Sequence, residues 1–126
     1  MAIPTPRARR GRHAQLSGLI AEALVSQVLL SDDWVIFGRR LRTEAGEIDI
    51  VAERDGVLAF IEVKQRKTLA DAAVCLSYRQ RKRLIGAAEI LLAEHPEWGR
   101  AGVRFDVMMV DAAGVVRRVV DAFRLD

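Results

Sequence analysis

The sequence contains little cysteine or histidine and no long uninterrupted apolar run. Cys75 is the single cysteine, which excludes an internal disulfide, and with only His13 and His95 beside it we expect no zinc cluster. The most apolar stretch, Leu19–Leu30, is interrupted by Glu22 and falls short of the ~18 apolar residues of a membrane span. No apolar segment of the signal-peptide type follows the N-terminal arginines. We therefore expect a cytoplasmic protein without a membrane segment.

Length and composition favour one folded domain. The chain has 126 residues, of which 51% are hydrophobic and 29% are charged, as in globular proteins with a packed core. Residues 1–12 combine two prolines with four arginines and show no apolar periodicity. We expect them to form a mobile basic arm, and we expect residues 13–126 to form the single domain.

The net charge is +3, and the positive excess lies in the first two thirds of the chain. Residues 1–83 hold fifteen basic and ten acidic side chains, whereas residues 84–126 hold five and seven. Within residues 64–83, Asp71 is the one acid among seven basic residues. Such a block is typical of a surface that binds a polyanion such as nucleic acid, and also of a basic surface that contacts only solvent.

Hydrophobic periodicity predicts two helices and five strands. Apolar residues recur every four positions over residues 14–30, which predicts the first helix. Ser77 is the expected N-cap of a second helix that ends before Pro96. The order αβββαββ predicts an α/β or α+β sandwich in which helices pack on one sheet, and we take the α/β class. The expected strands cover residues 34–42, 46–53, 57–64, 103–110 and 115–120.

The dipeptide Asp55-Gly56 lies between two of these strands and predicts a two-residue hairpin turn. The register of the two antiparallel strands then follows by counting outward from the turn. Ile48, Ile50 and Ala52 share one face, and all their partners are apolar, so that face belongs in the core.

On the other face of the hairpin, the same count places Asp49 directly opposite Glu62 and Glu47 opposite Lys64. Like charges at opposed positions repel, so something must compensate them. One carboxyl group takes up a proton, or a hard divalent cation such as Mg²⁺ binds between the two acids with Lys64 beside it. A solvated hairpin face that tolerates the repulsion is the plain alternative, and a one-residue bulge would separate the acids.

These residues resemble the pattern of the PD-(D/E)XK nucleases. The pattern consists of Glu22 on the first helix, Asp49 in Gly-Glu-Ile-Asp, and Glu62-Val63-Lys64 on the next strand. More narrowly, residues 11–110 are similar to the YraN-like family of small bacterial proteins. The resemblance implies a restriction-endonuclease-like sandwich, with a mixed central β-sheet flanked by helices.

The resemblance also implies a role for each residue of the pattern. Asp49, Glu62 and the carbonyl of Val63 would bind Mg²⁺ or Mn²⁺, Lys64 would assist the attacking water, and Glu22 would reach the metal directly or through water. The implied catalytic set is therefore Glu22, Asp49, Glu62 and Lys64, with no organic cofactor.

The leading functional hypothesis is a metal-dependent endonuclease-like protein that hydrolyses phosphodiester bonds in DNA, including branched DNA. Because cutting two strands takes two sites, we also expect a homodimer. The alternatives are a non-catalytic DNA-binding or interaction module that retains the fold, and a metal-dependent hydrolase of another phosphate substrate. Phosphate contacts are expected from Arg39, Arg40, Arg42, Arg66, Lys67, Arg79, Arg81, Lys82 and Arg83.

Overall fold

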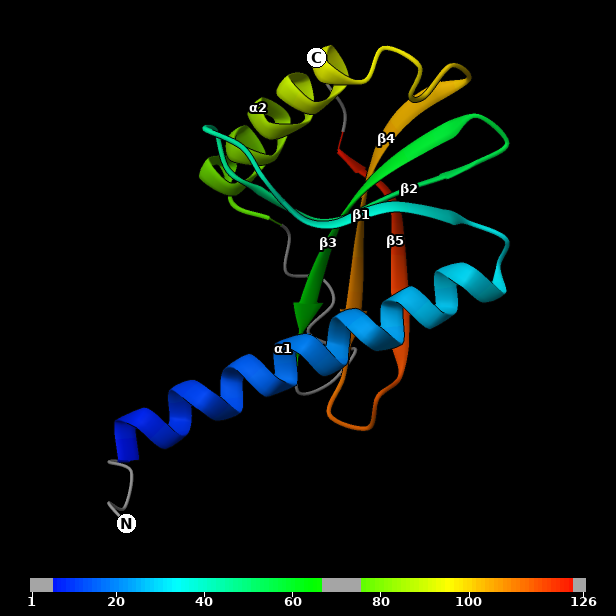
Figure 1. Ribbon diagram of the computed structural model, residues 1–126. Coiled ribbons are helices and arrows are strands. Elements are labelled where there is room, and N and C mark those ends of the chain that lie inside the picture. Colours follow the sequence, from blue (N-terminus) through cyan, green and yellow to red (C-terminus); the bar gives the residue numbers. More distant parts are fainter. Residues whose placement is uncertain (1–5, 67–75, 124–126) are drawn as a thin grey trace.

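The computed structural model describes residues 6–66 and 76–123, and it describes side chains over residues 18–66 and 76–119. Its element order is αβββαββ, as the periodicity predicts, and its five strands form one mixed sheet (Figure 1). The elements are α1 (Pro6–Ser31), β1 (Val35–Arg42), β2 (Glu47–Arg54), β3 (Val57–Gln65), α2 (Tyr78–Glu94), β4 (Gly102–Val110) and β5 (Val116–Phe123).

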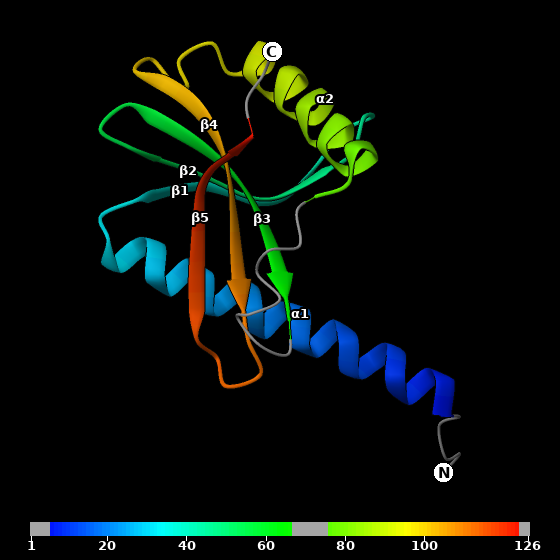
Figure 2. The same cartoon turned by 180° about the vertical axis from the view of Figure 1, so that it is seen from behind.

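The strands lie in the sheet in their chain order, from β1 at one edge to β5 at the other. Neighbouring strands are antiparallel except β3 and β4, which run parallel, and α2 lies in the connection between them. The helices α1 and α2 cover opposite faces of the sheet, as the view from behind in Figure 2 also shows. This is the expected α/β sandwich with a mixed sheet flanked by helices.

The hairpin of β2 and β3 has the predicted turn and register. Asp55 and Gly56 both have positive φ angles, of 53° and 79°, as a two-residue hairpin turn of this type requires. The paired positions run from Arg54 with Val57 to Ile50 with Ile61. The ladder of paired residues ends there, so β2 and β3 diverge at the end of the hairpin that carries the acidic residues.

Ile48, Ile50 and Ala52 are buried, as predicted, but they do not all lie on one side of the sheet. Both faces are buried, because α1 and α2 each pack against one of them. Ile50 and Ala52 lie in the α1-side cluster, whereas Val51 and Ile48 lie in the α2-side cluster. Ile48 lies beyond the last residue of β2 that pairs with β3, although it still pairs with Leu41 on β1.

The two helices differ in how closely they match their predicted bounds. Helix α2 begins after Ser77, whose side chain accepts a hydrogen bond from the backbone N–H of Gln80 in a capping box, and it ends before Pro96 as expected. Helix α1 begins at Pro6, a favoured first helical residue, so residues 6–12 of the expected arm are helical. Residues 1–5 of that arm lie outside the described residues. Neither helix, over its described length, is long and apolar enough to cross a membrane.

Candidate active site

The structure brings Asp49 and Glu62 together where β2 and β3 diverge. The Oδ2 atom of Asp49 accepts a hydrogen bond of 2.8 Å from the backbone N–H of Val63. At this point a side-chain oxygen of β2 takes the place of a backbone carbonyl as the partner of β3. Burial and then the charge of Glu62 raise the pKa of Asp49 to about 7, although the hydrogen bond from Val63 lowers it. The fold thus holds Glu62 close enough to Asp49 for its charge to act on that carboxyl group.

Lys64 pairs with one of the two acids. Its Nζ atom lies 3.3 Å from Oε1 of Glu62, and about a fifth of each side chain is exposed. The expected pairing of Lys64 with Glu47 is wrong, because the strands have separated before those positions. Glu47 instead lies 3.6 Å from the Nε atom of Arg42 on β1.

Glu22 approaches the two acids from α1. The Nε atom of Arg40 donates to both of its carboxylate oxygens, at 2.9 and 3.2 Å. The charge of Glu22 contributes to the raised pKa of Asp49, which shows that the three acids share one region. In the described part of the chain, however, no group of three or more acidic, histidine or cysteine side chains is arranged to hold a metal ion.

A cleft of about 330 Å³ opens beside the acids, and its far wall is the first part of α2. Arg83 lines this cleft together with Asp49 and Glu62. Sequence reasoning included Arg83 only as part of a basic block and missed Gln80, because neither residue is near the acids in the chain. The lining residues are Gly46, Glu47, Asp49, Glu62, Gln80, Arg83 and Leu84.

The other expected phosphate contacts are spread over separate parts of the surface. Arg79, Arg81 and Lys82 are exposed on the first turns of α2, close to the cleft. The Nη1 atom of Arg66 donates to the Gln65 carbonyl, and Lys67 lies outside the described residues. The three basic residues of β1 differ in role: Arg40 holds Glu22, Arg42 holds Glu47, and Arg39 lines a different cleft.

A further acid, Asp106 on β4, is buried, and the sequence alone gave no role for it. Its Oδ2 atom lies 3.1 Å from Nη2 of Arg104 and 2.6 Å from Nη2 of Arg118, and the side chain is fully buried. Both guanidinium groups also lie over the ring of Trp34, at 5.0 and 4.5 Å from its centre. An acid between apolar residues of a predicted strand was the one available signal for this cluster.

The fold is an α/β sandwich in which two helices flank a five-stranded mixed sheet, and Asp49, Glu62 and Lys64 lie together where β2 and β3 diverge. The chain belongs to UPF0102, the YraN family, an uncharacterised protein family whose model matches residues 21–110 and whose superfamily is PD-(D/E)XK.

Relatives in several bacteria match almost the whole chain. A UPF0102 protein of Granulibacter bethesdensis is 62% identical over 93% of this chain and 74% of its own length. A UPF0102 protein of Azorhizobium caulinodans is 46% identical over 97% of this chain and 93% of its own. One of Acidiphilium cryptum is 42% identical over 95% and 93%.

Proposed function

We propose that this protein is a metal-dependent endonuclease that hydrolyses phosphodiester bonds in DNA, including branched DNA. The observation that carries the proposal is the juxtaposition of Asp49 and Glu62, with Lys64 on one acid and Arg83 in the lining of the same cleft. Two carboxylates provide the oxygen ligands that a hard divalent cation prefers, and the two cations suit a phosphate group. The superfamily to which the family belongs supports the same chemistry.

The acidic residues fit a divalent ion such as Mg²⁺ or Mn²⁺. Burial and then the charge of Glu62 raise the pKa of Asp49, and a cation bound to both carboxylates would offset both effects. Mg²⁺ is commonly bound by one or two carboxylates, with water and substrate phosphate completing its shell, so a third acid is not required. Asp49, Glu62 and the carbonyl of Val63 would hold the ion. Such an ion lowers the pKa of water and offsets charge that develops on phosphate.

The chain's own residues position the reacting groups. The N–H of Val63 holds the Asp49 carboxylate, and Glu62 holds the Lys64 ammonium at 3.3 Å. Lys64 would orient the attacking water and place a fixed positive charge near the phosphate. Arg40 fixes Glu22 on the α1 side, where its charge acts on Asp49.

DNA would bind mainly through its phosphates. Arg83 lines the cleft, and Arg79, Arg81 and Lys82 are exposed on the same first turns of α2. A helix N-terminus favours anions, so four cations there are better explained by a bound phosphate than by the helix itself. Affinity should fall steeply with added salt, because each neutralised phosphate releases counterions.

The experiment that tests the proposal compares metal binding with DNA cleavage. Mg²⁺ and Mn²⁺ are titrated by calorimetry into the wild type, Asp49→Asn and Glu62→Gln, and the same proteins are incubated with branched, nicked and single-stranded DNA. We expect binding and cleavage in the wild type, and a loss of cleavage of about a hundredfold or more in both variants. Glu47→Gln is the matched control, since Glu47 lines the same cleft but pairs with Arg42. Equal metal binding by all four proteins would contradict the proposed site.

A second candidate is a DNA-binding module without catalysis. It is favoured by the lack of a three-residue metal group within the described residues. It predicts salt-sensitive DNA binding that Arg83→Gln weakens, together with no cleavage in Mg²⁺ or Mn²⁺ at any DNA structure. Cleavage that Asp49→Asn removes would exclude this candidate.

A further inference from the structure

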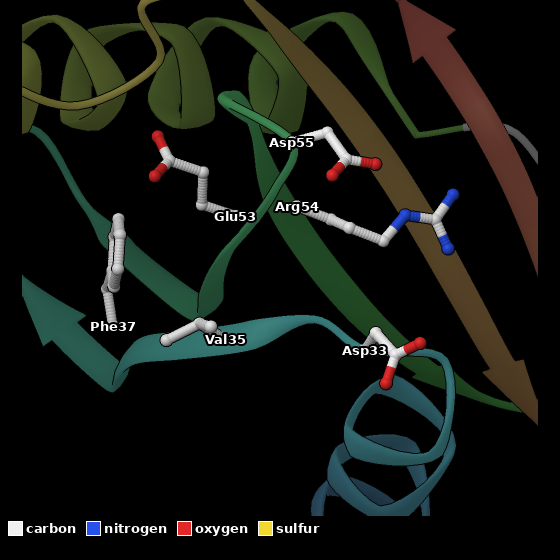
Figure 3. Close-up of a pocket in the computed structure, with 6 residues that line it drawn as sticks. All are labelled: Asp33, Val35, Phe37, Glu53, Arg54 and Asp55. Atoms are coloured by element: carbon white, nitrogen blue, oxygen red, sulfur yellow. The ribbon is translucent and has the colours of Figure 1, made fainter.

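A pocket of about 410 Å³ lies at the edge of the sheet and shares no lining residue with the cleft of the candidate active site (Figure 3). Two of its lining residues are exposed apolar side chains of β1, Val35 at 58% and Phe37 at 38%. Val35 pairs with Glu53 across β1 and β2, so these two side chains share one face of the sheet. The pocket, which we call the Phe37 pocket, is lined by Asp33, Val35, Phe37, Glu53, Arg54 and Asp55.

Phe37 is the end ring of a stack of three rings. Its centroid lies 5.3 Å from that of Trp98, with 26° between the two planes. Trp98 also stacks on His95, at 3.8 Å and 5°, and packs against the α2-side core. The stack thereby holds Phe37 on the α2 side of the sheet, while the part of its ring that Trp98 leaves uncovered lines the pocket. A ring held in this way attracts a cation over its open face.

The carboxylate of Glu53 is held close to this ring. Its Oε1 atom accepts a hydrogen bond of 2.8 Å from the backbone N–H of Gly99, in the connection between α2 and β4. Figure 3 shows Glu53 and Phe37 projecting from neighbouring strands to the same side of the sheet. A carboxylate accepts several hydrogen bonds, so one neutral N–H leaves both charge and acceptor capacity for a further donor. A planar cation that stacks on Phe37 can therefore also donate to Glu53.

The acidic residues of the pocket exceed its basic ones. The described lining holds three acids, Asp33, Glu53 and Asp55, against Arg54. The Nη1 atom of Arg54 lies 2.8 Å from Oδ2 of Asp32, which is outside the lining, and Figure 3 shows the Arg54 side chain directed away from Glu53. Among the residues that the structure describes, none forms an ion pair with the three acids. The pocket therefore keeps an excess of negative charge, although the whole chain carries +3.

We propose that the Phe37 pocket binds an arginine side chain of another protein. A guanidinium group is planar, stacks on aromatic rings and donates two parallel hydrogen bonds to a carboxylate, which an ammonium group does not. Phe37 provides the ring and Glu53 provides the carboxylate. The exposed Val35 adds apolar surface for the methylene stem of the arginine or for a neighbouring side chain of the partner.

Other occupants fit the pocket less well. The phosphates of DNA would meet the three carboxylates. An added β-strand would need a regular edge, whereas β1 shifts register between Ile36 and Gly38. The basic start of α1 in the same chain lies at the far end of a helix of 26 residues, about 39 Å away along its axis (Figure 1). The proposal goes beyond the nuclease hypothesis and does not depend on it, because the pocket and the cleft have separate linings.

The first test titrates blocked pentapeptides into the isotope-labelled full chain and follows its signals by NMR. The probe is acetyl-Gly-Val-Arg-Val-Gly-amide, and the comparison peptides carry lysine or glutamine in place of the arginine. We expect the arginine peptide to shift the signals of Phe37 and Gly99 with a dissociation constant of about 1–10 mM. The lysine peptide should bind about threefold more weakly, and the glutamine peptide at least about tenfold more weakly. Equal shifts with the glutamine peptide, no shift with the arginine peptide, or shifts of the same signals with duplex DNA overturn the proposal.

The second test repeats the arginine-peptide titration with variants. Glu53→Gln keeps an acceptor for the N–H of Gly99 but removes the charge, and it should weaken binding about tenfold. Phe37→Leu keeps apolar bulk but removes the ring, and it should weaken binding about fivefold. Glu94→Gln is the matched control, because it removes an exposed acid outside the lining, and it should stay within about twofold of the wild type. Circular dichroism of every variant shows that the fold is kept. Wild-type affinity in Glu53→Gln or Phe37→Leu, or an equal loss in Glu94→Gln, overturns the proposal.

Discussion

Asp106 and Asp49 are two acids of the same sheet that differ in which charged groups face their carboxylates. Asp106 on β4 is fully buried and receives two guanidinium groups, from Arg104 and Arg118. Asp49 on β2 receives one backbone N–H and lies beside a second acid, Glu62. Removing an acid whose charge is balanced inside the fold leaves its partners unpaired, whereas an acid crowded by another costs stability until a cation binds. The contrast separates a structural cluster from a candidate site without reference to any relative.

The largest effect should come from breaking the balanced cluster. Asp106→Ala leaves two partly buried guanidinium groups without their shared carboxylate, so we expect the free energy of unfolding to fall by about 3–5 kcal/mol. Urea denaturation measures it. Glu89→Gln, at an exposed position of α2, is the control and should change stability by less than about 0.5 kcal/mol. A loss below about 1 kcal/mol for Asp106→Ala would contradict the structural role.

Removing the charge of Asp49 should instead raise the free energy of unfolding. Asp49→Asn keeps the acceptor for the N–H of Val63 and removes the charge beside Glu62, so at pH 8 we expect a gain of about 1–2 kcal/mol in unfolding free energy. The same variant should lose DNA cleavage. Equal or lower stability of Asp49→Asn at pH 8 would argue that the two acids do not repel in the folded protein.

The pH dependence of that gain follows from the direction of the pKa shift. The pKa of Asp49 is raised from 3.8 to about 7 on folding, so the folded chain holds a proton that the unfolded chain releases. The contribution of Asp49 to stability therefore falls as pH rises from about 4 to about 7. We expect the wild type and Asp49→Asn to be alike near pH 4 and to differ fully above pH 7. A difference that does not change with pH would contradict the shift.

A divalent ion should stabilise the crowded acids and leave the balanced cluster unaffected. Mg²⁺ at a hundred times its dissociation constant should add about 2.7 kcal/mol at most to the wild type, less any binding to the unfolded chain. The melting temperature with and without EDTA measures it. Asp49→Asn should lose the effect, and Arg118→Lys, which alters the Asp106 cluster, should keep it. Stabilisation of both variants alike would place the ion elsewhere.

The smallest effect on stability should come from Lys64→Gln. Lys64 is partly exposed and pairs with Glu62 at the rim of the site, so the unfolding free energy should change by less than about 1 kcal/mol. Cleavage should fall by about a hundredfold or more, because the fixed charge near the phosphate is lost. Matched unfolding curves and single-turnover cleavage rates check both. Full activity in Lys64→Gln would remove Lys64 from the proposed mechanism.

Much of the fold follows from short-range chemistry that the sequence displays. Asp55-Gly56 can adopt the positive φ angles of a tight turn, and counting from it predicts the register as far as Ile50 with Ile61. Ser77 caps α2 because its hydroxyl reaches an N–H three residues on. Both features depend on neighbours in the chain, which is why the sequence alone predicts them.

The tertiary structure decided the features that depend on contacts between residues distant in the chain. Counting from the turn, β2 and β3 separate beyond the pair of Ile50 and Ile61. Ile48 lies there in the α2-side cluster, and the N–H of Val63 donates a hydrogen bond to Asp49. The pairing of Glu22 with Arg40, and the pairing of Asp106 with Arg118, join residues that periodicity treats separately. By itself the sequence determined the order of the elements, the turn and the caps, because these depend on backbone preferences over a few residues. Only the packing of two helices on one sheet decided which charges meet, because a buried charge must be paired and its partner can be distant in the chain.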